Sequence, residues 1–360
     1  MSKQRVVVAM SGGVDSSVAA GLLCRAGYDV VGITMRLYTE GRDDLPESNR
    51  TCCGVEAVDD AQAVAQALGI PYYLMNFERA FQTHVIDYFV DEYARGRTPI
   101  PCLACNQHLK FDLLLQKAMA LGADYVATGH YAQVAQVDGR YRLLKGADPW
   151  KDQSYFLYTL GQAELQRTLL PVGGLTKGET RAAAIELGLP VADKPESQEI
   201  CFIPDNDYRR FIEERLPATP GELVDTTGRV VGAHHGVTHY TVGQRHGLGV
   251  ASPAPLYVTA IDAAANRVVV GPVAALLAAG ALVEDVYFVQ GPPDRYPLEV
   301  TVKVRYRSPF AAATLEPANG GGVAVRFAEA QRAITPGQAA VFYRGDEVVG
   351  GGIIAGPLPH

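Results

Sequence analysis

Short apolar runs alternate with helical segments through the first 130 residues. Residues 5–10 form a β-branched run that ends at Ser-Gly-Gly, which is typical of a buried parallel strand. Ser16 and Ser17 suit a helix N-cap, and good helix formers follow as far as Gly27. Further strands are predicted over 29–35, 71–77 and 123–128, and further helices over 57–68, 81–94 and 110–121. This alternation predicts an α/β domain with a doubly wound parallel sheet, which binds ligands at the carboxyl ends of its strands.

The pattern then changes along the chain. Residues 134–144 predict a hairpin that turns at Asp138-Gly139, and residues 177–187 predict a helix. Beyond about residue 206, glycine, proline and short alternating runs predict small β modules. A short helix is expected at 272–279. We therefore expect three domains: an α/β domain at 1–206, a small central β-rich module at 207–278 and a C-terminal β-barrel at 279–360.

The turn after the first strand, Ser-Gly-Gly-Val-Asp-Ser at residues 11–16, carries the first chemical signal. Gly12 and Gly13 permit backbone angles that other residues resist. Converging N–H groups and the helix dipole form an anion cradle. The turn lacks the lysine of a Walker loop, and Asp15 suits Mg²⁺ held against a polyphosphate. The alternative is an ordinary glycine-rich βα turn.

Composition narrows the class of protein. The chain has 360 residues, of which 48% are hydrophobic and 20% charged, and its formal net charge is −7. This charge argues against a broadly basic nucleic-acid coat but allows local basic patches. The chain has no apolar run of membrane-spanning length, and its N-terminal apolar stretch is too short for a signal peptide. We therefore expect a cytoplasmic protein whose six cysteines form no structural disulfide framework.

Two cysteine segments stand apart from the predicted core. Cys102 and Cys105 form a C-x-x-C in a proline-rich segment, and Cys201 is followed by Phe-Ile. Neither segment has helical apolar periodicity, so a loop is expected around the C-x-x-C. Reactive thiols, structural thiols and, for Cys201, a buried apolar residue all remain open. Cys52 and Cys53 are expected to be structural or incidental to redox chemistry.

The hexapeptide turn resembles the pyrophosphate loop of the ATP pyrophosphatases, which cleave ATP between its α and β phosphates and adenylate an oxygen of the substrate. Nearly the whole chain is similar to one branch of that superfamily, the tRNA-specific 2-thiouridylases of the MnmA family. The motifs that carry the resemblance lie at residues 11–16, 105–106 with 110–111, 127–131, 151–155, 196–203 and 240–249.

The resemblance implies an adenine nucleotide alpha-hydrolase-like first domain, ATP and Mg²⁺ as cofactors, and 2-thiolation of the wobble uridine of tRNA. The C2 oxygen of uracil would be adenylated, and sulfur from a cysteine persulfide would displace it. By resemblance Cys201 matches the persulfide carrier, and Cys105 matches the second, nucleophilic cysteine, which can resolve the product as a disulfide. The sulfur would come from a cysteine desulfurase or a sulfur-relay protein, and the target base would leave its stack.

One segment departs from the family pattern. The family often has Asn-Pro-Asp where this chain has Ile100-Pro101-Cys102, so the acid proposed to assist catalysis is absent. Cys102 could take its place as a thiolate. Alternatively Cys102, Cys105 and Cys201 could bind a [4Fe–4S] cluster. We rank that route below the persulfide route, because C-x-x-C alone is a weak cluster signal; no metal site is firmly predicted.

The resemblance also implies binding residues. Those for ATP are Ala9, Met10, Ser11, Gly12, Gly13, Val14, Asp15, Ser16, Met35 and Gly129. Those for tRNA are His130, Lys151, Asp152, Gln153, Arg305, Tyr306 and Gln338. Residues 303–307 read as one strand, whose alternation puts Lys303, Arg305 and Arg307 on one face as a basic footprint on the C-terminal barrel. A core methionine, a structural histidine, a polar loop and a solvated strand face are the plainer alternatives.

Two other functions remain open at this point. A ligating ATP pyrophosphatase that acts on a small metabolite would leave the C-x-x-C and the β modules unexplained. A non-catalytic, nucleotide-regulated RNA-binding module would bind without releasing pyrophosphate.

Overall fold

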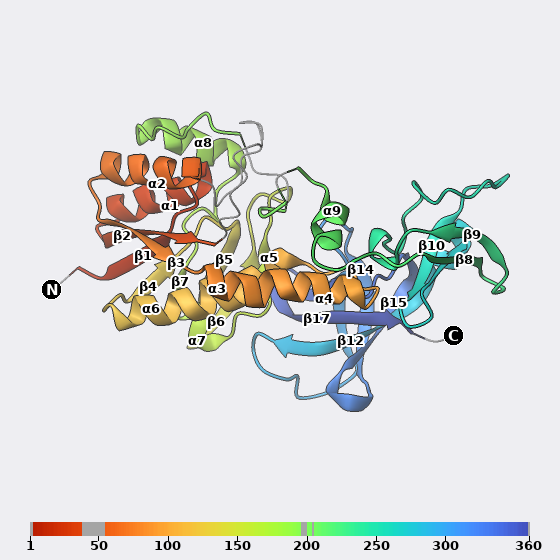
Figure 1. Ribbon diagram of the computed structural model, residues 1–360. Helices are drawn as coiled ribbons and strands as arrows, with labels where there is room; N and C mark the ends of the chain where they lie inside the picture. The colour runs from red at the N-terminus through yellow and green to blue at the C-terminus, as the bar shows by residue number, and fades with distance from the viewer. Residues whose placement is uncertain (1–2, 38–54, 196–199, 204, 359–360) are drawn as a thin grey trace. The chain divides into compact units, whose positions relative to one another are not determined.

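The computed structural model describes residues 3–37, 55–195, 200–203 and 205–358 (Figure 1). The chain divides into two compact units. Unit 1 comprises Met1–Ile86, Cys102–Asn206 and Asp346–Val348, and unit 2 comprises Asp87–Pro101, Asp207–Gly345 and Val349–His360. Cys52, Cys53 and the motif residues 196–199 lie outside the described residues.

A parallel sheet forms the centre of unit 1. Its strands are β1 (Arg5–Ala9), β2 (Asp29–Arg36), β3 (Tyr72–Asn76), β4 (Tyr125–Ala127) and β7 (Thr168–Leu169), in the order β3-β2-β1-β4-β7. Each of these strands runs parallel to its neighbours in the sheet. Val6 and Val8 of the central strand are fully buried, as an unbroken apolar run in a covered sheet requires. The predicted parallel sheet is therefore confirmed.

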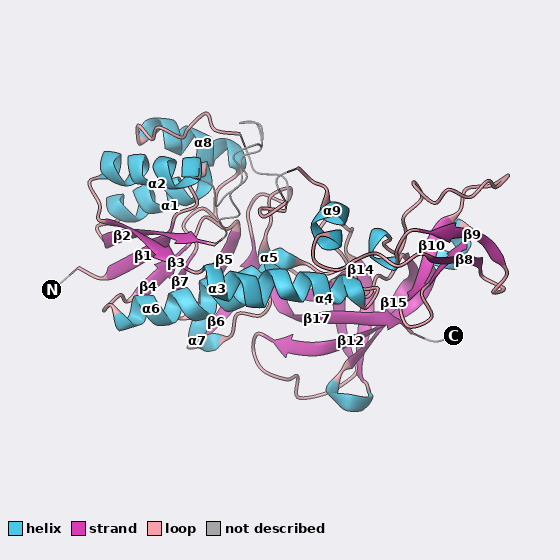
Figure 2. Ribbon diagram, in the orientation of Figure 1, coloured by secondary structure: helices cyan, strands magenta, loops and turns pink. Residues whose placement is uncertain are grey.

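Helices cover both faces of this sheet (Figure 2). On one face lie α1 (Val14–Arg25), α2 (Val55–Leu68) and α8 (Lys177–Glu186), and on the other lies α6 (Leu115–Ala120). Apolar residues of α1, α2 and α8 share one core with β1, including Val18, Leu23, Val64 and Ala184. The remaining helices of unit 1 are short: η3 (Ser154–Leu157) and α7 (Gln162–Leu165). The helical run from α3 (Glu78–Phe81) through η1 (Gln82–Asp87) continues into α4 (Tyr88–Ala94) of unit 2.

The loop predicted around the C-x-x-C is wrong, because that segment is helical. Pro101 opens α5 (Pro101–Ala104), and Cys105 is the first residue of the π-helix η2 (Cys105–Leu114), which runs on into α6. Proline suits the first position of a helix, where its missing N–H has no partner to lose. The i→i+5 bonding of a π-helix does not follow the 3.6-residue period, so the apolar pattern conceals it.

The hairpin predicted at 134–144 is confirmed. Strands β5 (Ala132–Val137) and β6 (Arg140–Lys145) pair antiparallel. Asp138 and Gly139 have φ of 51° and 77°, and positive φ at both central residues makes a type I′ turn. Leu144 of β6 pairs in turn with Glu347.

Unit 2 contains the small β-rich module that was expected after the first domain. Strands β8 (Gly221–Asp225), β9 (Val230–His234), β10 (Tyr257–Asp262) and β11 (Arg267–Gly271) form a sheet in the order β10-β11-β8-β9. Leu223, Val258 and Val268 are fully buried beneath it. Helices α9 (Tyr208–Glu213) and η4 (Val237–His239) accompany the sheet.

A closed barrel completes unit 2 and confirms the predicted C-terminal architecture. Its strands are β12 (Leu277–Phe288), β13 (Leu298–Lys303), β14 (Ala311–Pro317), β15 (Val323–Arg332), β16 (Ala339–Arg344) and β17 (Glu347–Pro357), and η6 (Asn319–Gly321) joins β14 to β15. They follow the order β12-β15-β14-β13-β16-β17, and pairing of β12 with β17 closes the ring. Alternate residues of several strands fill the interior, among them Val302, Leu315, Val325 and Phe342.

Two predictions fail in unit 2. The helix predicted at 272–279 is only a 3₁₀ turn, η5 (Val273–Leu276), because Leu277 already pairs with Arg332 in the barrel. Strand pairing thus overrides the helix propensity of the alanines. The strand predicted over 303–307 ends at Lys303, where a turn begins: Ser308 Oγ accepts from the Arg305 N–H at 3.2 Å. Lys303, Arg305 and Arg307 therefore share no strand face.

Candidate functional site

The turn between β1 and α1 depends on a glycine at position 12. Gly12 has φ of 66°, and a Cβ there would lie 2.2 Å from the Ala57 carbonyl oxygen. The helix N-cap is Gly13, so the prediction of Ser16 or Ser17 as the cap is wrong. Both serines lie in the first turn of α1, where their hydroxyls donate to the Gly13 carbonyl at 3.2 and 2.8 Å.

The end of β4 closes one side of this turn. A Cβ on Gly129 would lie 2.5 Å from the Ser16 nitrogen and 2.6 Å from the Asp15 carbonyl carbon. Met35 lies near the end of β2, on the other side of β1, and is buried. The carboxyl ends of β2, β1 and β4 are neighbours, so the structure brings the hexapeptide, Met35 and Gly129 to one edge of the sheet.

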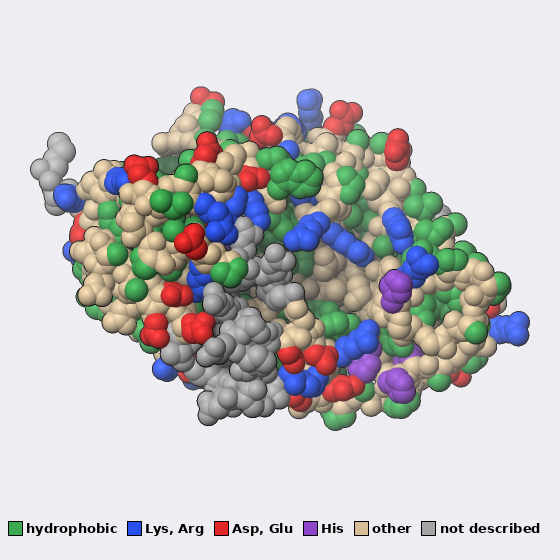
Figure 3. Space-filling model, turned by 90° about the horizontal axis from the view of Figure 1, so that it is seen from above, with side chains coloured by type: hydrophobic (Ala, Val, Ile, Leu, Met, Phe, Trp, Pro, Cys, Tyr) green, Lys and Arg blue, Asp and Glu red, His purple; other side chains and the backbone are tan. Residues whose placement is uncertain are grey.

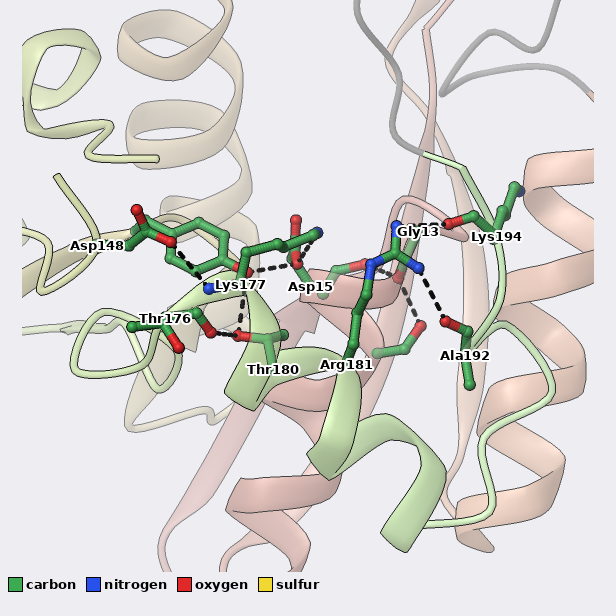
Figure 4. Close-up of polar contacts among 12 residues, drawn as sticks. Gly13, Asp15, Asp148, Thr176, Lys177, Thr180, Arg181, Ala192 and Lys194 are labelled. Atoms are coloured by element: carbon green, nitrogen blue, oxygen red, sulfur yellow. Dashed lines mark hydrogen bonds and ion pairs between the residues drawn. The ribbon is translucent and has the colours of Figure 1, made fainter. Parts of the chain in front are cut away.

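Asp15 is engaged by side chains that come from far along the chain (Figure 4). Lys177 Nζ lies 2.6 Å from Asp15 Oδ1, and the hydroxyl of Tyr131 donates to the same oxygen at 2.8 Å. Lys177 is the first residue of α8 and packs at the turn with only 14% of its side chain exposed. The hexapeptide contains no lysine, but the fold places one beside it.

The start of α8 is fixed by two carboxylates. Thr176 caps the helix: its hydroxyl accepts from the Glu179 N–H, and Glu179 accepts from the Thr176 N–H at 2.7 Å. Asp148 Oδ2 accepts from the backbone N–H of Lys177 at 2.9 Å, and this bond together with those from Trp150 and Lys151 lowers the pKa of Asp148. Asp148 is therefore an anionic anchor for the segment that presents Lys177.

A second lysine supports the glycine turn itself. Lys194 Nζ donates to the Gly12 carbonyl at 3.1 Å and forms an ion pair with Asp60. Arg181 of α8 donates to the carbonyls of Ala192 and Lys194 at 3.2 and 3.3 Å, which holds the segment in place (Figure 4). The sequence interpretation missed both lysines, since no local spacing relates them to residues 11–16.

His130 is buried rather than presented at a surface. His130 is 9% exposed, and its Nδ1 lies 2.7 Å from Thr128 Oγ1. Burial, with a contribution from the Lys110 charge, lowers the pKa of His130 well below its ordinary value. The imidazole is therefore neutral at pH 7.

The side chains of Asp152 and Gln153 bind backbone groups that flank the 151–153 segment. Asp152 accepts from the Gly146 N–H at 3.0 Å and from the N–H and hydroxyl of Ser154 at 3.1 Å. Gln153 Oε1 accepts at 3.0 Å from the backbone N–H of Tyr131, the residue whose hydroxyl donates to Asp15. The segment is therefore built as a fixed turn.

Trp150, which the sequence interpretation did not single out, is 89% exposed at this turn. It is the one tryptophan of the chain. Its backbone N–H donates to Asp148 Oδ1 at 2.9 Å, so the indole stands on a fixed backbone. The useful sequence signal would have been the aromatic residue directly before Lys151.

The cysteines that the structure describes are thiols: Cys24, Cys102, Cys105 and Cys201. Cys102 is exposed, Cys105 is buried and Cys201 is partly buried, all in unit 1. Phe202, beside Cys201, packs edge-on against Phe81 of α3 at 5.6 Å between ring centroids, and α3 in turn packs on η2. The segment that carries Cys201 thus lies against the helix layer in which Cys105 begins η2.

The described residues give no support to an iron–sulfur cluster on Cys102, Cys105 and Cys201. Among the described residues, no three His, Cys, Asp or Glu side chains are arranged to hold a metal ion. Cys102 is exposed, whereas Cys105 is buried.

Two of the predicted tRNA residues of unit 2 are tied to their own unit. Arg305 Nη2 donates to the carbonyls of Val242 and Ala333 at 3.0 and 3.1 Å and to the hydroxyl of Thr335. Gln338 Nε2 donates to the Thr98 carbonyl at 2.8 Å.

Tyr306, the third predicted tRNA residue of unit 2, packs beside a cation. Lys303 Nζ lies 5.5 Å from the centroid of its ring. The face drawn in Figure 3 carries both cationic and anionic side chains. No helix in the described part of the chain is both long and apolar enough to cross a membrane.

Comparison with known proteins identifies the family. A family model described as the tRNA methyl transferase HUP domain matches residues 4–205. Models described as the tRNA methyl transferase PRC-barrel domain and the aminomethyltransferase beta-barrel domain match residues 209–272 and 279–354. The tRNA-specific 2-thiouridylase MnmA of Clostridium perfringens is 51% identical over 356 residues, which cover 98% of this chain and 99% of that protein. The chain belongs to the MnmA family.

A second curated relative agrees with this assignment. The MnmA protein of Heliobacterium modesticaldum is 54% identical over 359 residues, covering 98% of this chain and 92% of that protein. Among solved structures, a 4-thiouridine synthetase–RNA complex with bound ATP is 18% identical with a TM-score of 0.33, covering 59% of this chain and 50% of that one. That likeness is too slight to transfer substrate or mechanism. The resemblance to the MnmA family drawn from the sequence motifs is therefore confirmed.

Proposed function

We propose that this chain is a tRNA-uridine 2-sulfurtransferase that uses ATP to convert the wobble uridine of tRNA to 2-thiouridine. The observation that carries the proposal is the polyphosphate cradle: the Gly12 turn, the first turn of α1 and the bare Gly129 meet at the carboxyl edge of the sheet. Membership of the MnmA family over nearly the full chain supports tRNA as the substrate that is modified with this ATP site.

The nucleotide would lie with its phosphates on the cradle and its adenine toward Met35. The proposed ATP contacts are Ala9, Met10, Ser11, Gly12, Gly13, Val14, Asp15, Ser16, Met35 and Gly129. Asp15 is the carboxylate suited to hold Mg²⁺, because Mg²⁺ at a nucleotide site commonly takes one or two carboxylates together with phosphate oxygens. The bound ion would neutralise phosphate charge. The chain's own contribution is the N–H groups of the turn, which receive the phosphates.

Activation is needed because the C2 oxygen of uracil is amide-like and leaves poorly. In the proposed first step, that oxygen attacks the α-phosphorus of ATP, an O–P bond forms, and the α–β bond breaks to release pyrophosphate. The adenylated oxygen can then leave as part of AMP. Binding the two substrates in line converts this to an effectively unimolecular step.

Sulfur transfer is proposed to use two thiols of unit 1. The terminal sulfur of a Cys201 persulfide attacks C2 and AMP departs. The Cys105 thiolate then attacks the inner sulfur, the S–S bond of the persulfide breaks, and its electron pair remains on the new C2 sulfur. A Cys105–Cys201 disulfide results, and an external thiol reductant resets it. Cys102, which stands where relatives often have an acid, is proposed to assist as a thiolate.

Recognition of tRNA is proposed to involve His130, Lys151, Asp152, Gln153, Arg305, Tyr306 and Gln338, with the C-terminal barrel as an RNA-binding domain. The three domains proposed from the sequence span residues 1–206, 207–278 and 279–360. The uridine would be extruded from its stack to reach the thiols. A cysteine desulfurase or a relay protein would supply the sulfur in the cytoplasm.

The experiment combines nucleoside analysis with mass spectrometry of Cys201. Incubation with ATP, Mg²⁺, unmodified tRNA, a cysteine desulfurase and cysteine should produce 2-thiouridine and pyrophosphate. Without tRNA, Cys201 should carry one added sulfur, and Cys201→Ser should neither carry it nor thiolate tRNA. Cys24→Ser, on α1, is the matched control and should retain activity. Normal thiolation by Cys201→Ser would refute the carrier role.

A further inference from the structure

We propose that Lys177 is the cationic ligand of the pyrophosphate part of ATP, and that nucleotide binding exchanges its ion pair with Asp15 for one with phosphate. The inference rests on the proposed function only in taking ATP as the molecule bound at the residue 11–16 turn. The proposal adds Lys177 to the site, a residue that lies far along the chain from the hexapeptide at residues 11–16.

The position of the ammonium group carries the proposal. Lys177 Nζ is 2.6 Å from the carboxylate of Asp15, which lies in the first turn of α1, directly after the glycine turn. Its side chain is only 14% exposed, whereas that of Asp15 is 33% exposed. A largely buried cation acts on a neighbouring phosphate with little screening from water. Any phosphate that reaches the amides of this turn therefore lies within reach of Lys177.

The lysine is also held in place from its backbone. Asp148 accepts the Lys177 N–H at 2.9 Å, and the Thr176–Glu179 capping box fixes the preceding residue. The hydroxyls of Tyr131 and Thr180 lie 3.0 Å apart, linking α8 to the residue that also binds Asp15 (Figure 4). Such support reduces the ordering that a side chain must undergo when its ligand arrives.

Charge balance explains the exchange. In the structure, Asp15 and Lys177 neutralise each other, so neither charge is left uncompensated in a partly buried site. A magnesium polyphosphate brings a cation for the carboxylate and anionic oxygens for the ammonium, so both partners can be exchanged at once. Lys194 differs, because its ammonium is engaged with the Gly12 carbonyl and Asp60 and supports the turn.

The test compares Lys177→Met with Lys177→Arg by calorimetric titration with a non-hydrolysable α,β-methylene ATP analogue and Mg²⁺. Lys177→Met should weaken binding of the analogue about 10- to 100-fold, as expected for the loss of one charge-assisted contact. Lys177→Arg should bind within about threefold of wild type, because it keeps the charge. Lys145→Met is the matched control, because Lys145 is a lysine of the same unit that pairs with a different carboxylate, Asp346, at 3.6 Å.

A second ligand separates phosphate contact from a structural role. AMP lacks the pyrophosphate part, so Lys177→Met should bind AMP within about threefold of wild type. Equal loss of AMP and analogue would show that the substitution disrupts the turn, and would overturn the proposal. Wild-type affinity of Lys177→Met for the analogue would overturn it as well.

Failure of the proposed function gives a different result. If the wild-type chain binds the analogue and Lys177→Met does not, but no 2-thiouridine forms with a sulfur donor, the sulfurtransferase assignment fails and the Lys177 assignment stands. If the wild type thiolates tRNA and Lys177→Met binds the analogue normally, only the Lys177 assignment fails.

Discussion

The hydroxyl oxygen of Tyr131 lies 2.8 Å from Oδ1 of Asp15, and the tyrosine ring is 2% exposed. Tyr131→Phe removes this donor while keeping the ring. We expect the free energy of unfolding to fall by about 1.5 kcal/mol, because a buried hydrogen bond to a charged acceptor is lost. Urea denaturation measures the change. Tyr28→Phe, which keeps the half-buried ring that packs on Tyr125, should change it by less than about 0.5 kcal/mol; equal values for the two variants would contradict the assignment.

Burial of neutral His130 predicts a pH dependence of stability. Its pKa in the folded chain is below the ordinary value, so below about pH 6.5 the unfolded chain binds a proton that the folded chain does not. The His130 contribution is therefore complete above pH 6.5 and declines as the pH falls toward the folded-state pKa. The loss approaches about 1.4 kcal/mol per pH unit.

The measurement is urea denaturation at pH 7.5 and pH 5.5 of the wild type and His130→Gln. The glutamine variant should lose less stability between the two pH values than the wild type. His246→Gln, at an exposed position, should lose as much as the wild type. An identical loss in all three proteins would show that the pKa of His130 does not differ between the folded and the unfolded chain.

Trp150 offers an optical signal for tRNA binding. As the one tryptophan of the chain, 89% exposed beside Lys151, it should be quenched when an unstacked base or the backbone covers it. Titration with tRNA should give saturable quenching. Trp150→Ala should raise the Kd for tRNA about fivefold or more, with unfolding free energy unchanged within about 0.5 kcal/mol. Constant emission at saturating tRNA would place this turn outside the interface.

Arg305 should affect stability and tRNA binding separately. Arg305→Lys should lower the free energy of unfolding by about 2 kcal/mol, because an ammonium cannot reproduce the bonds to Val242, Ala333 and Thr335. The dependence of tRNA affinity on salt should be unchanged, since the charge remains. Arg305→Ala should be similarly destabilised. It should also reduce the slope of the logarithm of the tRNA association constant against log salt by the amount expected for about one phosphate contact. An unchanged slope in Arg305→Ala would restrict Arg305 to a structural role.

The parallel sheet and the glycine turn between β1 and α1 were predictable because their sequence signals are local. An unbroken β-branched run bounded by glycines favours a strand covered on both faces, and glycine at a strand–helix junction indicates a turn with positive φ or a close approach of other atoms. The lysines at the cradle were not predictable, because Lys177 and Lys194 reach it only through the placement of α8 and the segment after it.

Two further failures have physical causes. The helix around Cys105 is π-wound, and its bonding pattern erases the period from which helices are inferred. The residues predicted as a basic strand at 303–307 have the alternation of a strand. In the structure the strand ends at Lys303, because the Arg305 N–H donates to the Ser308 hydroxyl in a turn. The Arg305 guanidinium donates to carbonyls of unit 2. Competition between strand pairing and local side-chain bonding cannot be read from alternation alone.

The helix that begins at Pro101 presents Cys102 to solvent and turns Cys105 inward. A water-soluble alkylating reagent should therefore label Cys102 before Cys105, since access of the reagent governs the rate along with the thiolate fraction. Dissolved oxidants would meet the same residue first. The outer thiol would then shield the inner one, which must stay reduced if it is to take part in each turnover.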